Sequence, residues 1–326
     1  MQINMSHGSG GKASAELMKD IFGKYFSNET LNKMEDAAVL ELHGKFAYST
    51  DSFVVTPVVF KGGDIGKLSV CGTVNDLLMM GAEPAYLTAG FILEEGLELS
   101  LLEEIVASMA KTAEEAGVKI VAGDTKVVEG KGGLFINTSG IGIIPEGRNI
   151  GAANCSEGDL VLVSGTLGDH HACILSNRMG IENQITSDCA CLKSIVERLL
   201  ENNIRVKTMR DVTRGGLGTI LNEIADASNC GIEIKEDSIP VRPEVRSFCD
   251  ILGLDPVYMG NEGKLIAVVA QEDGERALAL MRETEYGQDA AVIAKVVNGK
   301  GVYMKTRLGG SRIVDVLYGE GLPRIC

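Results

Sequence analysis

The chain has 326 residues, about twice the length of a usual single domain, so two folded domains are expected. Hydrophobic residues make up 45% and charged residues 23%, which excludes an intrinsically disordered chain. The formal net charge of −14 opposes unspecific binding to nucleic acid or to an anionic membrane surface. The eight cysteines are too sparse for a disulfide scaffold, and no secretion signal or membrane-spanning run is present. We therefore expect a cytoplasmic protein with reduced thiols.

The first half of the chain alternates helix and strand patterns. Residues 6–12 form a polar loop, and a helix pattern follows through 15–22. Residues 46–59 are predicted to form strands that meet at a turn over 49–52, where Ser-Thr-Asp-Ser interrupts the apolar run. The patterns then predict helices over 66–80 and 99–116, and strands over 86–93, 118–122 and 134–144.

The second half begins after a polar, glycine-containing segment over 145–158 that is typical of a linker. We expect helices near 168–180, 188–202, 215–228, 243–252 and 273–284, and strands near 159–164, 232–234, 264–270, 291–297 and 301–305. Alternating helices and strands in both halves predict two α/β or α+β domains. From residue 308 onward the periodicity fades, so 308–326 is expected to be a tail.

Carboxylates lie between apolar runs at four places in the first half: Asp36, Asp51, Asp76 and Asp124. A carboxylate is costly to bury unless it is paired or binds a metal ion. These side chains could converge on Mg²⁺, which prefers oxygen ligands and usually bridges carboxylates to nucleotide phosphates. The alternative remains open that Asp76 or Asn75 caps a helix and that Asp51 and Asp124 are turn residues.

Two glycine-containing segments are candidates for phosphate binding. The loop that ends at Gly10, Gly11 and Lys12 can present backbone N–H groups and a cation, although it lacks the P-loop spacing. Residues 210–216, with sequence RDVTRGG, precede a predicted helix and would offer Arg214 to an anion and Asp211 to a metal ion. A flexible terminus and a capped helix are the respective alternatives.

Three further residues carry chemistry that a structural role does not need. Lys126, two residues after Asp124, could neutralise phosphate or take part in proton transfer. Glu262 precedes an apolar strand and is either a general base or a turn residue. Cys326 is the last residue. The 16 residues 311–326 could act as an arm that carries this thiol from its own site to that of another protein.

Motifs throughout the chain resemble those of the HypE family of hydrogenase maturation factors. This family comprises the carbamoyl dehydratases of the PurM-like, or aminoimidazole ribonucleotide synthetase-like, ATP-binding superfamily. The motifs are HGSGGK (7–12), EDAAVL (35–40), TDSFVVTP (50–57), NDLLMMGAEP (75–84), AGDTKVV (122–128), RDVTRGG (210–216), GNEG (260–263) and PRIC (323–326). Each is a modest signal alone, whereas the set in this order is highly specific.

The resemblance implies a PurM-like two-domain fold. Residues 1–150 would form an ATP-binding domain whose sheet pairs with that of a second copy in a homodimeric barrel. Residues 151–307 would form an α+β domain, and 308–326 a mobile tail that carries Cys326. A carbamoyltransferase partner of the HypF type would load carbamoyl onto Cys326. ATP would then convert the carboxamide to a thiocyanate, and a scaffold complex of the HypC–HypD type would accept the cyano group for the iron of [NiFe]-hydrogenase.

The resemblance also implies roles for individual residues. Asp36, Asp51, Asp76, Asp124 and Asp211 would hold Mg²⁺ and ATP, while Lys126 and Glu262 would assist deprotonation. Residues expected to contact the nucleotide are Gly8, Gly10, Gly11, Lys12, Thr50, Asn75, Gly123, Thr125, Arg214 and Asn261. Glu35 stands where many relatives carry a second aspartate, so the motif does not assign residue 35 a role.

Other members of the superfamily share the carboxylates. A selenophosphate synthetase would place its reactive cysteine near the N-terminus, whereas the first cysteine here is Cys71. Thiamine-phosphate kinase and aminoimidazole ribonucleotide synthetase need no terminal thiol. A non-catalytic thiol carrier would need no set of buried aspartates. The sequence leaves open whether the tail enters its own pocket or that of a neighbouring subunit.

Overall fold

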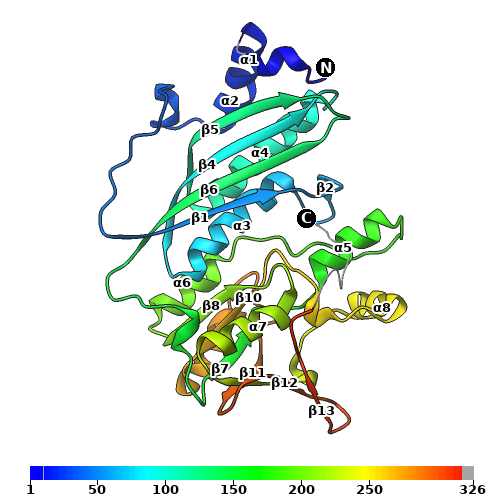
Figure 1. Ribbon diagram of the computed structural model, residues 1–326. Helices are drawn as coiled ribbons and strands as arrows, with labels where there is room; N and C mark the ends of the chain where they lie inside the picture. The colour runs from blue at the N-terminus through cyan, green and yellow to red at the C-terminus, as the bar shows by residue number, and fades with distance from the viewer. Residues whose placement is uncertain (10, 318–326) are drawn as a thin grey trace.

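The computed structural model describes residues 1–9 and 11–317, so Gly10 and Cys326 lie outside the described residues (Figure 1). A four-stranded sheet has the order β1-β6-β4-β5, and a seven-stranded sheet has the order β13-β12-β9-β11-β7-β10-β8. In Figure 1 the first sheet lies above the second, with helices packed against both. The two-domain mixed α/β fold expected from the sequence is confirmed.

The N-terminal sheet has one covered face and one open face. It comprises β1 (Lys45–Phe53), β4 (Glu83–Glu94), β5 (Lys119–Val128) and β6 (Leu134–Ile144). Helices α3 (Ile65–Met79) and α4 (Leu99–Ala116) pack against one face. On the other face Tyr48 is 68% exposed and Ile92 is 47% exposed. Because β1 and β5 are the outer strands, the sheet has two open edges.

The two helices differ in how much of their surface is buried. Helix α4 buries a stripe that includes Leu102, Ile105 and Met109, the spacing of one helical face, and it ends at Gly117 in the left-handed conformation. Helix α3 begins at Asp64, whose side chain accepts the N–H groups of Gly66 and Lys67. It is buried at every position except Lys67, in its first turn, and Asp76, in its last turn, so a carboxylate is partly exposed at the end of an otherwise enclosed helix.

Short elements surround this sheet. The N-terminal segment forms η1 (Met5–Gly8), α1 (Lys12–Leu17), η2 (Met18–Phe22), α2 (Gly23–Tyr25) and η3 (Leu31–Lys33). A small hairpin of β2 (Val59–Phe60) and β3 (Gly63–Asp64) precedes α3. These elements place the glycine-rich N-terminal loop next to β5, because η1 contacts this strand.

The C-terminal sheet lies between two hydrophobic layers. Its strands are β7 (Leu160–Val163), β8 (Val206–Asp211), β9 (Gly231–Lys235), β10 (Leu265–Val269), β11 (Ala291–Val297), β12 (Gly301–Lys305) and β13 (Ser311–Ile313). Its helices are α5 (Asp169–Arg178), α6 (Lys193–Glu201), α7 (Gly216–Ala227), α8 (Pro243–Leu252) and α9 (Gly274–Arg282). One hydrophobic core continues from this sheet into the N-terminal domain, so the two domains share a packed boundary.

Three local predictions are wrong in physically informative ways. β1 runs without a turn, and Asp51 pairs in register with Thr138 of β6, because ladder hydrogen bonds override the turn preference of Ser-Thr-Asp-Ser. β5 continues through Gly123, Asp124 and Lys126, which pair with β4, so this segment is no loop. The expected tail, 308–326, begins with β13, which pairs with β12.

No helix within the described residues is both long and apolar enough to cross a membrane.

Candidate active site

Carboxylates from both domains gather beside β1. Asp51 comes from β1, Asp76 from the last turn of α3 and Asp211 from the end of β8, which contacts α3. Ser49 of β1 donates its hydroxyl to Oδ2 of Asp76 at 2.5 Å. Arg214 and Glu262 lie near enough to these carboxylates to shift their protonation. We call Asp51, Asp76, Asp211, Arg214 and Glu262 the β1-edge group.

The negative charges of the β1-edge group repel one another. Burial, followed by the charge of Asp76, raises the pKa of Asp51 to about 6, although the charge of Arg214 acts in the opposite direction. Burial, again followed by the charge of Asp76, raises the pKa of Asp211 to about 7. Such repulsion costs stability unless a cation or donor neutralises it, which is typical of a functional site rather than of a structural one.

Glu262 lies in a turn between Asn261 and the start of β10. Burial, followed by the charges of Asp188 and Asp211, raises the pKa of Glu262 well above its usual value. A carboxylate with a raised pKa is a stronger base, which suits a residue that accepts a proton near neutral pH. The alternative that Glu262 is only a turn residue does not account for its three acidic neighbours, Asp188, Asp211 and Asp51.

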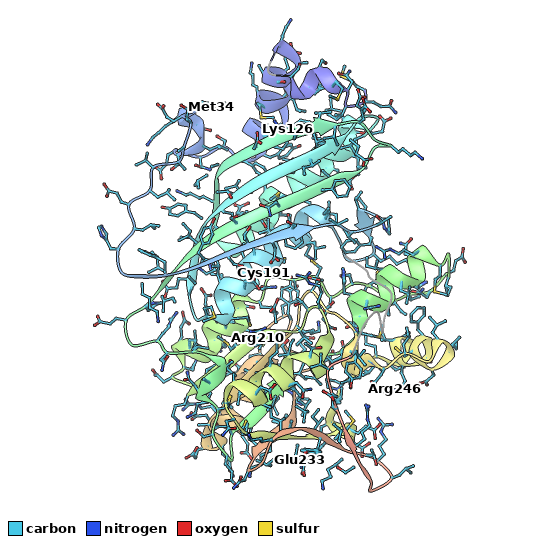
Figure 2. The ribbon with its side chains drawn as sticks, in the orientation of Figure 1. Met34, Lys126, Cys191, Arg210, Glu233 and Arg246 are labelled. Carbon is cyan, nitrogen blue, oxygen red and sulfur yellow. The ribbon has the colours of Figure 1, made fainter. Side chains whose placement is uncertain are left out.

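A second set of predicted residues lies at the opposite edge of the sheet, on and around β5. Asp36, Gly123, Asp124 and Thr125 line one pocket with a volume of about 220 Å³. Gly8 lies directly against β5, since a Cβ at this position would be 2.8 Å from Cβ of Val127. Asp36, Asp124 and Lys126 are exposed, and Figure 2 shows Lys126 on β5. We call Gly8, Asp36, Asp124 and Lys126 the β5-edge group.

The two groups are separated within one chain. The register aligns Asp51 with Thr138, Ala89 and Gly123 across the sheet, so β1 and β5 are three strand spacings apart. At about 4.8 Å per spacing this is about 14 Å. Among the described residues no group of three or more His, Cys, Asp or Glu side chains could hold a metal ion by itself. The five predicted metal ligands therefore do not form one cluster in a single copy.

Two residues that were predicted to contact the nucleotide are buried and bound to the backbone. Asn75 is 2% exposed, and its amide accepts from the N–H of Leu192 and donates to the carbonyl of Ala190. Asn261 is equally buried, and its amide accepts from the N–H of Gly168 and donates to backbone carbonyls of 212 and 259. Both amides are thus engaged by the backbone in this structure, and their contact with a nucleotide stays a prediction.

The other predicted residues have mixed outcomes. Thr50 faces away from Asp51 on β1 and donates to the carbonyl of Thr138. Lys12 is exposed at the start of α1 and forms an ion pair with Glu16 at 3.6 Å, while Gly11 has open space around it. Asp76 lies in the last turn of α3, so neither it nor Asn75 caps the start of a helix. The nucleotide roles of Thr50, Gly11 and Lys12 stay predictions.

Sequence reasoning missed a buried ion pair behind Glu262. Lys264 and Asp188 form it at 3.3 Å between Nζ and Oδ2, and both side chains are almost completely buried. Lys264 was included only as the start of a strand, and Asp188 as the start of a helix that in fact begins at Lys193. A charged residue at each end of otherwise apolar runs was the available signal.

Comparison with known proteins first places the chain in the class of AIR synthase related proteins. The model of the AIR synthase related protein N-terminal domain matches residues 34–144, and that of the C-terminal domain matches residues 156–307. Solved thiamine-monophosphate kinases, such as one from Stenotrophomonas maltophilia K279a at 21% identity and a TM-score of 0.68, share the fold.

Within this class the chain belongs to the HypE family of carbamoyl dehydratases. It is 48% identical to the carbamoyl dehydratase HypE of Rhodobacter capsulatus, over 100% of this chain and 98% of the relative. It is 46% identical to that of Escherichia coli (strain K12), over 99% of each chain. A crystal structure of the hydrogenase maturation protein HypE in complex with ATP superposes with a TM-score of 0.95 at 47% identity, covering 99% of both chains. The family resemblance of the motifs is thereby confirmed.

Proposed function

We propose that this chain is an ATP-dependent carbamoyl dehydratase that acts on its own Cys326 and supplies the cyanide ligand for [NiFe]-hydrogenase. The observation that carries the proposal is the β1-edge group, in which three repelling carboxylates, an arginine and Glu262 meet at the domain boundary. A packed structural boundary has no use for such repulsion, whereas a site for a cation that carries nucleotide phosphates does. The name of the relatives supplies the reaction type.

The proposed reaction replaces a poor leaving group by a good one. The carboxamide oxygen on the Cys326 sulfur attacks the γ-phosphoryl group of ATP, and ADP leaves. The nitrogen loses one proton as the oxygen is phosphorylated. It loses the second as the C–O bond breaks and the C≡N bond of the thiocyanate forms, and this proton leaves on the departing phosphate. Glu262 is the proposed acceptor of the first proton, because it lies close to Asp51 and Asp211 and burial makes its carboxylate more basic than a free one.

Asp51, Asp76 and Asp211 would supply part of the ligands of a magnesium ion, although no three such side chains among the described residues could hold one by themselves. They offer oxygen ligands, and the repulsion that raises the pKa of Asp51 and Asp211 would be relieved by a cation. Mg²⁺ usually binds one or two carboxylates together with substrate phosphates, so it does not need a complete cage of protein ligands. When bound, it would neutralise charge on the nucleotide phosphates. Arg214 is the proposed anion partner from the same group.

We further propose that a homodimer completes the site. The β1-edge group and the β5-edge group lie at opposite edges of one sheet, and both edges are open. A barrel in which β1 of one copy lies beside β5 of the other would bring the two groups next to each other. The exposed Tyr48 and Ile92 on the open face support this arrangement, because the barrel would bury them. Lys126 would then approach Glu262 from the partner copy.

Complementation between inactive variants tests the homodimer. Asp51→Asn and Asp124→Asn are each expected to be inactive, since every site would lack one group. In a mixture refolded together, a heterodimer would have one site with both aspartates intact, so activity should return to about a quarter of the wild-type value when chains pair at random. A mixture without activity, from variants that still form dimers, would refute the shared site.

The proposed partners follow from the family. A solved HypE–HypF complex contains a HypE chain 48% identical to this one, with a TM-score of 0.82 over 92% of this chain. We propose that a HypF-type carbamoyltransferase loads Cys326, and that a HypC–HypD-type scaffold accepts the cyano group, in the cytoplasm.

The direct test of the function follows the mass of Cys326. The full chain, carbamoylated by its partner enzyme, is incubated with Mg²⁺ and ATP, and the C-terminal peptide is examined by mass spectrometry. Loss of one water from the carbamoylated peptide, with release of one phosphate per chain, is the expected result. Phosphate release that does not depend on carbamoylation would contradict the proposal. ATP without Mg²⁺ should give no loss of water.

A further inference from the structure

The backbone around Glu262 is held by an internal segment of the C-terminal domain, Ser187–Leu192, which we call the clasp. The two carboxylate oxygens of Asp188 accept the N–H groups of Glu262 and Gly263, each at 3.2 Å. The N–H of Ala190 donates to the carbonyl of Glu262 at 3.3 Å. Glu262 is therefore bound by the clasp on both sides of its own peptide unit.

The contact between the clasp and the Glu262 turn leaves no space for a side chain. A Cβ at Gly263 would lie 1.8 Å from the carbonyl oxygen of Asp188. Glycine at this position thus permits the close approach of the two backbones that the hydrogen bonds require. A shift of Asp188 would be transmitted directly to the turn.

The negative charge of Asp188 is stabilised by an ion pair with Lys264. Burial alone would raise the pKa of Asp188, but Lys264 and the N–H donors hold it below its usual value. Nζ of Lys264 lies 3.3 Å from Oδ2 of Asp188, with both side chains almost fully buried. A buried carboxylate that stays ionised and is hydrogen-bonded has one defined position, which suits a support for another residue.

The other end of the clasp is bound next to Asp76, one of the carboxylates of the β1-edge group. Asn75 of α3 donates to the carbonyl of Ala190 at 3.0 Å and accepts from the N–H of Leu192 at 2.9 Å. Asn75 directly precedes Asp76 of the β1-edge group. A continuous set of hydrogen bonds thus runs from the residue next to Asp76, through the clasp, to Glu262.

We propose that Asp188 is a positioning residue, which acts through the clasp to fix Glu262 relative to Asp76 and thereby relative to the bound nucleotide. The inference rests on the proposed role of Glu262 as a base. Neither Asp188 nor Asn75 needs to contact the substrate or the nucleotide. Their effect on the reaction should therefore pass entirely through Glu262, and this separates positioning from general structural support.

A double-mutant cycle tests the proposal on the full, carbamoylated chain. Asp188→Asn retains the volume but replaces one acceptor oxygen by an amide donor that faces N–H groups and Lys264. We expect kcat for phosphate release to fall about ten- to a hundredfold, because misplacement of a reacting group by about 1 Å costs this much. KM for ATP should change little. In the Glu262→Gln background the same substitution should have almost no further effect on kcat.

The controls distinguish positioning from loss of folding. Asp159→Asn is matched, because Asp159 is also a buried carboxylate that accepts a backbone N–H, that of Ser156, in the C-terminal domain. It should leave kcat unchanged in both backgrounds. Asn75→Ala breaks the clasp at its other end and should reproduce the dependence on Glu262, which keeps the test valid if Asp188→Asn does not fold.

The outcomes separate this inference from the proposed function. If Glu262→Gln is nearly inactive and Asp188→Asn lowers kcat by the same factor in both backgrounds, the positioning role is refuted while the function stands. If Asp188→Asn and Asn75→Ala keep full kcat, it is refuted as well. If Glu262→Gln itself keeps full turnover, the role of Glu262 as a base is wrong, and the positioning role is wrong with it.

Discussion

Replacement of Asp76 by asparagine should weaken nucleotide binding and, at the same time, stabilise the folded protein. In the nucleotide-free protein the charge of Asp76 raises the pKa of both Asp51 and Asp211. Asparagine removes this charge, and its side-chain oxygen can still accept the 2.5 Å hydrogen bond from Ser49. We therefore expect Asp76→Asn to bind Mg²⁺ and ATP at least about tenfold more weakly, yet to unfold less readily than the wild type.

The size of the stabilisation follows from the pKa shifts. The pKa rises from 3.8 to about 6 for Asp51 and from 3.8 to about 7 for Asp211. Each unit corresponds to about 1.4 kcal/mol, but burial is the larger cause in both cases, and Asp51 is partly exposed to screening solvent. We therefore expect that removing the charge of Asp76 raises the free energy of unfolding by about 1–2 kcal/mol.

The pH dependence gives this prediction a sign. A carboxyl whose pKa is raised on folding lowers stability at high pH, where it is ionised, and this penalty disappears as pH falls toward the unfolded value of 3.8. The gain from Asp76→Asn should be complete near pH 8 and largely absent near pH 5. Urea unfolding followed by far-ultraviolet circular dichroism measures it, since the chain has no tryptophan. A variant less stable than the wild type at pH 8 would refute the reasoning.

Three further predictions concern single side chains. Cys326→Ala should abolish thiocyanate formation while calorimetry finds ATP binding nearly unchanged; lost ATP binding would contradict a thiol that only visits the site. Glu262→Gln should lower kcat for phosphate release far more than it raises KM, and unchanged turnover would return Glu262 to a turn role. Burial lowers the pKa of His171 to about 4, so its contribution to stability is complete above pH 6.5 and is lost toward pH 4. His171→Phe should therefore reduce the slope of the unfolding free energy against pH, measured in urea between pH 6.5 and pH 4, by up to about 1.4 kcal/mol per pH unit. An unchanged slope would contradict a lowered pKa of His171.

The sequence predicted most elements because hydrophobic periodicity records burial on one side of a helix or strand. Helices α4 and α8 end at the glycines that follow them, Gly117 and Gly253, and α8 begins at Pro243. The prediction failed where the local preference of a few residues competes with a ladder of backbone hydrogen bonds, as at Asp51 in β1 and Asp124 in β5. Strand pairing is a non-local property, so a window of neighbouring residues does not contain it.

The candidate site was predicted as residues but not as an arrangement. Apolar runs on both sides indicated Asp51 and Asp76, and the RDVTRGG segment indicated Asp211; the structure brings these three together. The order of strands in the sheet, which separates them from Asp124, is not written in the motifs. The backbone hydrogen bonds of Asn75 and Asn261 were not predicted, because a buried amide that binds the backbone and one that binds a ligand have the same local sequence signature.

The open face of the N-terminal sheet has a consequence for how this protein is handled. If two copies bury Tyr48 and Ile92 against each other, part of the folding free energy belongs to association and obeys mass action. The melting temperature should then rise with total chain concentration and fall on dilution. Thermal data taken at one concentration would describe that sample alone, and a titration of concentration would report the strength of the pairing itself.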